Sequence, residues 1–331
     1  MPFRSIVGHQ HVVDLLARAV ARDSLPPSLI LSGPEGVGKR RVALALAQAV
    51  NCLRPVTSET GIRSQESGIR SQESGIRSRE SGIRSQEPGG RSPEPGARKD
   101  ACGECAVCRR IERGIHPDVL VVDERGVHPE VLDVEVKEGS AVIPVEVARQ
   151  VSKVAWFRPY EGRRRVIIID PADAMERPHG QNALLKVLEE TPPATVFVLV
   201  TARPDVLYAT IRSRCPQIRF GALTVAEITE VLTGERGLSE RAARAAAIVA
   251  AGSVARALEA ASEQTTDARS QALAVLQEAA TAREPRRLLE QMKAILGLDR
   301  RQGATLAAER EDVTLSLRAL SSLLRDVTLM Q

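Results

Sequence analysis

The first 220 residues alternate between short apolar runs and longer amphipathic segments. Continuous Val, Ile and Leu runs are typical of strands buried on both faces, and amphipathic segments of about ten residues or more are typical of helices. The pattern predicts strands at 28–32, 119–122, 165–169, 195–200 and 217–220, and helices at 40–50, 145–155 and 181–190. Strands separated by helices indicate an α/β fold, in which a parallel sheet carries helices on both faces.

This alternation is interrupted once and then ends. Residues 61–95 repeat a seven-residue unit such as GIRSQES, which contains glycine and at most one isoleucine. Such units offer too little apolar surface for a coiled coil, so we expect a disordered insertion from about 56 to 100. After Phe220 the strand pattern stops, and Ala- and Leu-rich helical patterns continue to residue 331. We therefore expect an α/β domain at 1–220 followed by helical material.

The composition indicates what kind of core the chain has and which partners its charge does not by itself imply. Aromatic residues make up only 2% of the chain, so the core must consist mainly of aliphatic side chains. A net charge of +4 does not by itself indicate nucleic-acid binding. The sequence contains neither a signal peptide nor an apolar run of about 18 residues, so we expect a soluble, cytoplasmic protein without a membrane partner.

A glycine-rich segment, GPEGVGKR at residues 33–40, lies directly between a predicted strand and a predicted helix. In that context the form G-x-x-x-x-G-K is typical of a P-loop, whose backbone N–H groups surround phosphate oxygens while its lysine reaches the outer phosphates. ATP is therefore a candidate ligand. The predicted nucleotide-binding residues are Gly33, Gly36, Gly38 and Lys39, with Asp170 at the end of the predicted strand RVIII.

Two residues near the predicted nucleotide-binding residues argue against ATP hydrolysis. Arg40 stands where a Ser or Thr hydroxyl would bind Mg²⁺, and Pro171 stands where an ATPase carries the glutamate that activates water. Each change removes one element of the hydrolytic site, and the two changes agree with each other. We expect no ATP hydrolysis by this chain; Asp173 is the alternative general base.

The segment CGECAVC contains Cys102, Cys105 and Cys108 at the spacing of metal ligands. A structural zinc ion takes four ligands, and a reducing compartment favours metal over disulfides. Cys52 is our choice for the fourth ligand, with Cys215 and then His116 as alternatives. A redox-active cysteine pair is a rival interpretation. A nucleic-acid-binding zinc module is disfavoured, because CGECAVCRRIERG has no aromatic residue to stack on bases.

These features together resemble the clamp-loader branch of the AAA+ ATPases, and within it the family of delta-prime subunits of bacterial DNA polymerase III. The resemblance is carried, apart from the P-loop and the cysteines, by the segments IVGHQHVVDLLARAV, GIHPDVLVV, FRPYEGRRRVIIIDPADAM, NALLKVLEETPP and TIRSRCPQIRF. It covers most of residues 1–260 outside the insertion. It implies an AAA+ P-loop domain with a zinc knob at 1–220, a helical lid at 221–263 and a helical collar at 264–331.

The resemblance also implies a function. Such a chain is the structural stator of a clamp-loader ring within the DNA polymerase III holoenzyme, which places a sliding clamp on primed DNA in replication. Its partners are the gamma/tau and delta subunits. The arginine of the Ser-Arg-Cys motif, Arg214 here, is the arginine finger given to the ATP site of a neighbouring subunit. The family's four zinc-binding cysteines correspond to Cys52, Cys102, Cys105 and Cys108.

Two departures accompany this resemblance. The lid segment VAAGSVARALEAA has Ala255 where hydrolysing relatives carry a sensor arginine, and Arg256 follows it. The collar is short or truncated, because 264–331 contains only about three helical patterns. The alternative function is an autonomous gamma/tau-like ATPase motor subunit.

Overall fold

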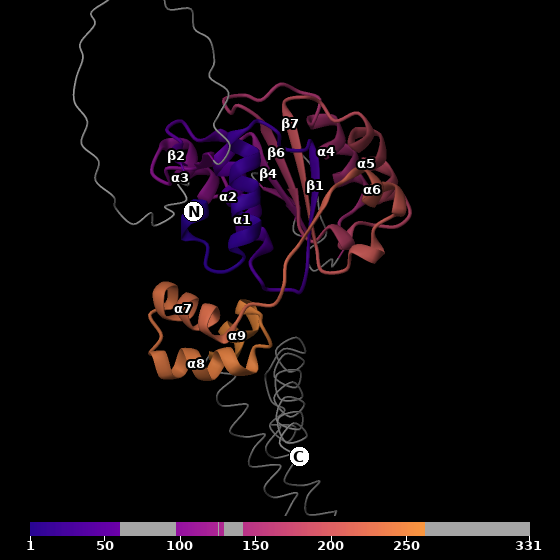
Figure 1. The fold of residues 1–331 in the computed structure, drawn as a ribbon. Helices are drawn as coiled ribbons and strands as arrows, with labels where there is room; N and C mark the ends of the chain where they lie inside the picture. Colours follow the sequence, from indigo (N-terminus) through magenta and orange to yellow (C-terminus); the bar gives the residue numbers. More distant parts are fainter. Residues whose placement is uncertain (60–96, 125, 129–141, 262–331) are drawn as a thin grey trace, which may run out of the picture. The chain divides into compact units, whose positions relative to one another are not determined.

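The computed structural model describes residues 1–59, 97–124, 126–128 and 142–261 (Figure 1). The predicted collar and the repeats of the insertion lie outside these residues. The chain divides into two compact units. The larger contains residues 1–32 and 39–219, and the smaller contains residues 33–38 together with those from 220 onward.

The larger unit is built on a six-stranded sheet with the order β5-β4-β6-β7-β1-β8. Only β5, at one edge, is antiparallel to its neighbour. Every residue of β1, β6 and β7 is buried, as expected for apolar runs in a sheet covered on both faces. The strands are β1 (Ser28–Ser32), β4 (Val119–Asp123), β5 (Gly126–His128), β6 (Arg165–Ile169), β7 (Thr195–Thr201) and β8 (Gln217–Arg219).

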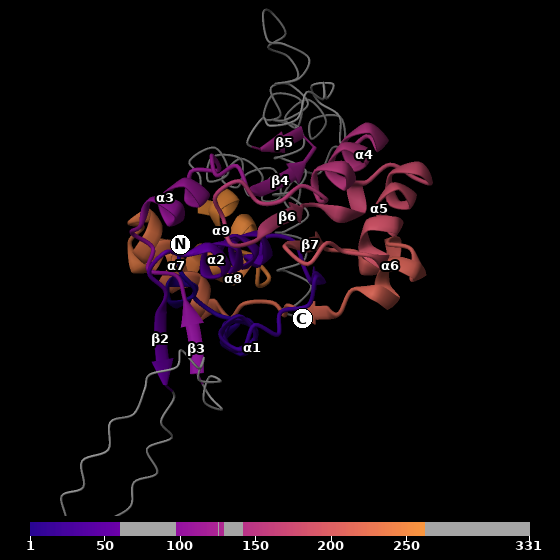
Figure 2. The same ribbon diagram turned by 90° about the horizontal axis from the view of Figure 1, so that it is seen from above.

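Helices cover both faces of this sheet (Figures 1 and 2). One face carries α1 (Gln10–Ala21), α2 (Lys39–Asn51) and α3 (Ala106–Glu112), and the other carries α4 (Val145–Val154), α5 (His179–Glu189) and α6 (Ala209–Arg214). Short 3₁₀ helices lie at Phe3–Ser5, Ala172–Ala174 and Pro204–Val206. The predicted α/β fold class is confirmed. None of the described helices combines the length and the apolarity that a bilayer-spanning helix needs.

The smaller unit contains three helices among its described residues: α7 (Val225–Arg236), α8 (Glu240–Val249) and α9 (Val254–Ala261). Its core consists of small and aliphatic side chains, including Ile228, Leu232 and Ala247. A capping box begins α7: the Thr224 side chain accepts from the backbone N–H of Glu227, whose carboxylate accepts from the backbone N–H of Thr224.

The ends of the predicted disordered insertion form a strand pair, so that prediction is wrong at its boundaries. Strands β2 (Val56–Glu59) and β3 (Ala97–Asp100) pair antiparallel, from Val56 opposite Asp100 to Glu59 opposite Ala97. The sequence pattern of four residues is too short to reveal this pairing, which depends on tertiary contacts. One such contact is the ion pair of Arg98 with Asp14 of α1, at 2.8 Å.

A buried ion pair joins the amino-terminal ends of two central strands. Asp118, which precedes β4, and Arg165, which begins β6, lie 3.1 Å apart (Oδ1 to Nη2), and both side chains are buried. The Asp118 carboxylate also accepts the backbone N–H groups of Tyr160, Glu161 and Gly162, at 2.7–2.8 Å. Burial alone would raise the pKa of Asp118, but these N–H groups and Arg165 outweigh it and lower the pKa. The pair is therefore charged, and of its polar side-chain atoms only Arg165 Nε is buried without a hydrogen-bond partner.

We predict that Asp118→Ala lowers the free energy of unfolding by about 3–5 kcal/mol, because Arg165 keeps a buried charge without a counterion. Urea unfolding followed by circular dichroism measures this. Asp23→Asn is the matched control, because asparagine tolerates the positive φ of 51° at this position. Asp23 pairs with Arg164 at 2.8 Å but is 85% exposed, so the loss should stay below about 1 kcal/mol. Equal effects of the two substitutions would contradict the importance of the buried pair.

The sign of the pH dependence follows from the lowered pKa. The stabilisation from Asp118 should be present above its unfolded pKa, ordinarily 3.8, and should be lost as the pH falls through the lower folded value.

Candidate functional site

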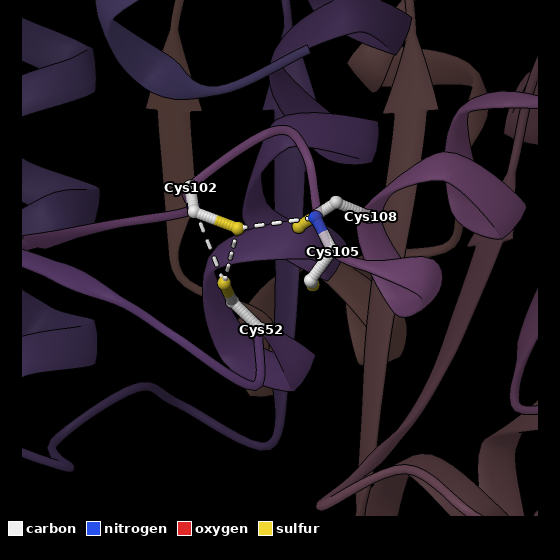
Figure 3. Close-up of side chains that lie close together, drawn as sticks. All are labelled: Cys52, Cys102, Cys105 and Cys108. Atoms are coloured by element: carbon white, nitrogen blue, oxygen red, sulfur yellow. Dashed lines mark hydrogen bonds between the residues drawn. The ribbon is translucent and has the colours of Figure 1, made fainter.

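Four cysteine side chains converge beside α2 and α3 (Figure 3). Cys52 directly follows α2, Cys102 follows β3, Cys105 is the N-cap of α3, and Cys108 lies within α3. Their sulfur atoms all lie within 4.8 Å of one another. The structure thus brings together the four cysteines chosen from the sequence. The strand pair β2–β3 explains how residues 50 positions apart meet, because it brings the two ends of the long insertion side by side.

The geometry of this cluster suits a tetrahedral metal ion. Zinc–sulfur distances of about 2.3 Å require sulfur atoms about 3.8 Å apart. The Cys52 and Cys102 sulfurs are 3.5 Å apart, and the backbone N–H of Cys102 donates to the Cys52 sulfur at 3.2 Å. Burial raises the pKa of Cys52, and the backbone N–H groups of Cys102 and Arg54 oppose that rise, because an N–H aimed at sulfur favours the metal-binding thiolate. Four thiols at these distances are positioned to bind a metal ion.

The two cysteines on α3 have opposite pKa shifts. Desolvation disfavours the Cys105 thiolate, but backbone N–H groups of Cys108 and Leu53 outweigh it and lower the pKa of Cys105 to about 6. Burial raises the pKa of Cys108 well above its ordinary value. Metal binding must therefore release a proton from the deeper cysteine, so affinity should fall as the pH is lowered.

The alternative ligands lie elsewhere. Cys215 is buried in the core that α4, α5 and the sheet form. His116 is fully buried, with its Nε2 atom 3.3 Å from Glu161 and its Nδ1 atom accepting from the backbone N–H of Asp118 at 3.2 Å. Burial lowers the pKa of His116, so the ring is neutral near pH 7. Neither side chain belongs to the cysteine cluster.

Arg40 places its guanidinium between two carboxylates at the carboxyl ends of β4 and β6. Its Nη2 atom is 3.2 Å from Asp123 and its Nη1 atom is 3.8 Å from Asp170. Burial raises the pKa of Asp170, and the charges of Arg40 and Lys39 oppose that rise. A cation of the chain itself therefore neutralises these acids. Asp123 was not predicted as a site residue; its signal in the sequence is the acid that ends the run VLVVD.

The predicted alternative general base has other partners. One carboxylate oxygen of Asp173 accepts from the Thr201 hydroxyl at 2.7 Å, and the other accepts from Arg203 Nε at 2.9 Å. The Asp173 side chain is only 6% exposed. A carboxylate with both oxygens engaged is poorly placed to accept a proton from water.

Two glycines of the predicted P-loop are packed against the smaller unit to which the loop belongs. A side chain at Gly36 would meet the Ser253 hydroxyl at 2.3 Å, and the Gly36 carbonyl accepts from the backbone N–H of Val254 at 2.9 Å. A side chain at Gly33 would meet the backbone oxygen of Phe220 at 2.4 Å. Both glycines have positive φ, +148° and +73° for Gly33 and Gly36. Packing and backbone conformation thus require glycine at both positions.

Arg214, the predicted arginine finger, ends α6 and lines an open cavity of about 640 Å³. Its guanidinium pairs with Glu189 at 2.7 Å and donates to the Thr210 carbonyl at 2.9 Å. Arg212 and Ser213 are exposed, whereas Cys215 is 1% exposed and packs in the core. The other residues that line the cavity are Pro27, Ser28, Leu188, Glu189, Glu190 and Thr191.

Residues 92–224 match the family model described as DNA polymerase III, delta subunit. The chain is similar to DNA polymerase III subunit tau of Escherichia coli (30% identity over 70% of this chain and 27% of the relative). It is also similar to subunit gamma of Buchnera aphidicola, with 26% identity over 70% of this chain and 48% of the relative. Subunit delta' of Pseudomonas aeruginosa matches at 29% identity over 57% of this chain and 41% of the relative. The chain is thus related to DNA polymerase III subunits, and it spans less than half of each of these relatives.

Two solved structures also resemble the chain at low identity. A gamma-subunit-related protein of Thermotoga maritima matches at 15% identity, with a TM-score of 0.40 and coverage of 93% of this chain and 90% of that one. A RuvB mutant of the same organism matches at 14% identity, with a TM-score of 0.44 and coverage of 97% and 88%.

We predict that Cys52→Ser lowers metal affinity by at least tenfold, because it removes one of four converging thiols from the site. The measurement is metal content after dialysis against a chelator of graded strength. Cys215→Ser is the matched control, since this buried cysteine lies outside the cluster. Equal retention of metal by Cys52→Ser and the unaltered chain would show that Cys52 is not a ligand.

Proposed function

We propose that this chain is the non-hydrolysing, delta-prime-like subunit of a DNA polymerase III clamp loader. In this role it assembles with gamma/tau and delta subunits, and the complex places a sliding clamp on primed DNA. The relationship to gamma, tau and delta' subunits supports a clamp-loader role. The single observation that carries the non-hydrolysing part of the proposal is the position of Arg40 between Asp123 and Asp170.

Three features of the chain's own site support the absence of turnover. A guanidinium neutralises the carboxylates that would otherwise help to hold a metal ion, and Pro171 follows Asp170 where a water-activating glutamate is needed. Asp173 is engaged by Thr201 and Arg203. The loop glycines are required by packing whether or not nucleotide binds. We infer that the P-loop is kept as scaffold; ATP can remain a ligand without being a substrate.

Arg214 is our proposed functional group, and it acts on a neighbouring subunit. A guanidinium is always charged, and its planar fork matches phosphate oxygens. Arg214 is 36% exposed and its partner Glu189 is 47% exposed. Such an exposed ion pair contributes at most about 1 kcal/mol, so a triphosphate presented by another subunit can replace Glu189. The buried Cys215 fixes the end of α6 while Arg214 faces solvent.

Zinc is our proposed occupant of the cysteine cluster. An all-thiolate set at tetrahedral spacing is the usual ligand set of structural zinc, which contributes free energy of folding when bound. Here the ligands follow α2 and β3, cap α3 and lie within α3, so the ion would hold α2 and α3 together.

The second candidate is a gamma/tau-like motor subunit. It is favoured by the comparisons, in which the chain matches tau of Escherichia coli at 30% identity over 230 residues, against 29% over 188 residues for delta' of Pseudomonas aeruginosa. It requires hydrolysis at a site where Arg40 and Pro171 oppose it.

We predict no measurable steady-state ATP hydrolysis by the isolated chain, and none by Arg40→Thr, because Pro171 remains in place of the glutamate. Phosphate release measured with excess Mg²⁺ and ATP tests both. Turnover by the unaltered chain that Lys39→Ala abolishes would establish the motor alternative.

We predict that Arg214→Ala lowers ATP turnover of the reconstituted clamp loader on primed DNA. An arginine finger is worth about 10³–10⁵ in rate at the site that it serves. Only the site facing this subunit should fail, so total turnover falls partially while clamp loading falls more. Arg212→Ala, two residues away and exposed, is the matched control and should retain loading. If Arg212→Ala fails and Arg214→Ala does not, the finger is Arg212.

A further inference from the structure

The turn after α4 exposes three of the chain's seven aromatic side chains. Trp156 is 53%, Phe157 64% and Tyr160 85% exposed. The other four aromatic residues, Phe3, Phe197, Tyr208 and Phe220, are buried or half-buried. In a chain with so few aromatic residues, a cluster of exposed rings within five positions does not serve the core, and exposed apolar clusters mark interaction sites.

The backbone that carries these rings is fixed by the Asp118–Arg165 pair. Asp118 accepts the backbone N–H of Tyr160 at 2.7 Å. Arg165 donates through Nη1 to the carbonyls of Val154 and Phe157, at 2.6 and 3.0 Å. The rings are therefore presented by an ordered backbone, so a ligand would pay little entropy to order it.

The charge around the rings is positive. Residues 156–164 contain Arg158, Arg163 and Arg164 against a single acid, Glu161. Glu161 pairs with Arg110 of α3 at 2.9 Å, and Arg164 pairs with Asp23. Among the ion pairs of the described residues, none involves Arg158 or Arg163. The partner expected from charge complementarity is thus an anion with many charges.

We infer that Trp156, Phe157 and Tyr160 form a stacking surface for single-stranded nucleic acid, whose phosphates contact Arg158 and Arg163. Aromatic rings combined with cations bind single strands without sequence preference, because every unpaired base offers a flat face. A duplex conceals these faces and should bind less well. A protein partner would instead need an apolar pocket ringed by acids.

This inference changes the interpretation of the cysteine segment. The segment CGECAVCRRIERG lacks aromatic residues, which disfavours nucleic-acid binding by that segment alone. The ion pair between Arg110 and Glu161, 51 residues apart, shows that α3 lies beside the aromatic turn, and this turn supplies the missing rings. The inference does not rest on the proposed role of Arg214.

Trp156 is the chain's only tryptophan, so fluorescence excited selectively at tryptophan reports on this surface alone. The full chain is titrated with oligodeoxythymidylate at low salt, and binding is measured in parallel by anisotropy of a labelled strand. We expect quenching on binding, and at least tenfold weaker binding of a duplex. Arg163→Ala should reduce the slope of log K against log salt by about 0.7.

Ring variants separate stacking from other contacts. Phe157→Ala and Phe157→Leu should both weaken strand binding by about fivefold or more, because leucine keeps apolar area but has no flat face. Ile248→Ala is the matched control, since Ile248 of α8 is 65% exposed and should be neutral. Both positions are exposed, so thermal unfolding should be unchanged in all three variants.

The inference is overturned if no strand binds at low salt, or if duplex and single strand bind equally. It is also overturned if Phe157→Leu binds as well as the unaltered chain, because the rings would then serve as plain apolar contacts of the kind a protein partner uses. None of these outcomes bears on ATP turnover in the reconstituted complex, so the proposed function stands or fails separately.

Discussion

The buried pair of Asp118 and Arg165 is the contact that positions the amino-terminal ends of β4 and β6 and the turn after α4. Isolated buried charges are costly, and this pair is tolerated because backbone groups bind the Asp118 carboxylate and the terminal nitrogens of Arg165. It aligns the starts of β4 and β6 and fixes the turn after α4. The turn is also linked to the cysteine cluster. The Asn51 side chain accepts the backbone N–H of Arg164 at 3.0 Å, and Asn51 directly precedes Cys52. One ion pair therefore couples the sheet, the aromatic turn and the candidate metal site.

At the opposite, carboxyl-terminal ends of the strands lies a second arrangement of charges. The carboxyl ends of β4 and β6 present Asp123 and Asp170, and Arg40 lies between them. At that edge a P-loop protein that hydrolyses ATP needs a metal ion and a base. This chain provides a fixed cation and a proline there. In the proposed function, this arrangement serves as structure, and the exposed Arg214 is the group that acts on a neighbour.

Much of the fold could be predicted because its signals are local. The apolar runs at 28–32 and 165–169 coincide with β1 and β6, since a strand buried on both faces must be apolar throughout. Strands β2 and β3 could not be predicted, because their pairing depends on contacts such as Arg98 with Asp14. The cysteine spacing indicated Cys102, Cys105 and Cys108 directly, whereas Cys52 had to be chosen among alternatives because it lies 50 residues before Cys102. The Arg40–Asp123 and Arg214–Glu189 pairs join side chains 83 and 25 residues apart, which no local pattern encodes.

The central claim is that this chain contributes to ATP turnover through Arg214 and not through its own P-loop. The most direct measurement compares two complexes of the same gamma/tau and delta subunits in one turnover assay, one with Lys39→Ala and one with Arg214→Ala in this chain. The account predicts that Lys39→Ala leaves the rate of clamp-stimulated turnover unchanged and that Arg214→Ala lowers it. A loss with Lys39→Ala and none with Arg214→Ala would contradict the account and assign hydrolysis to this chain.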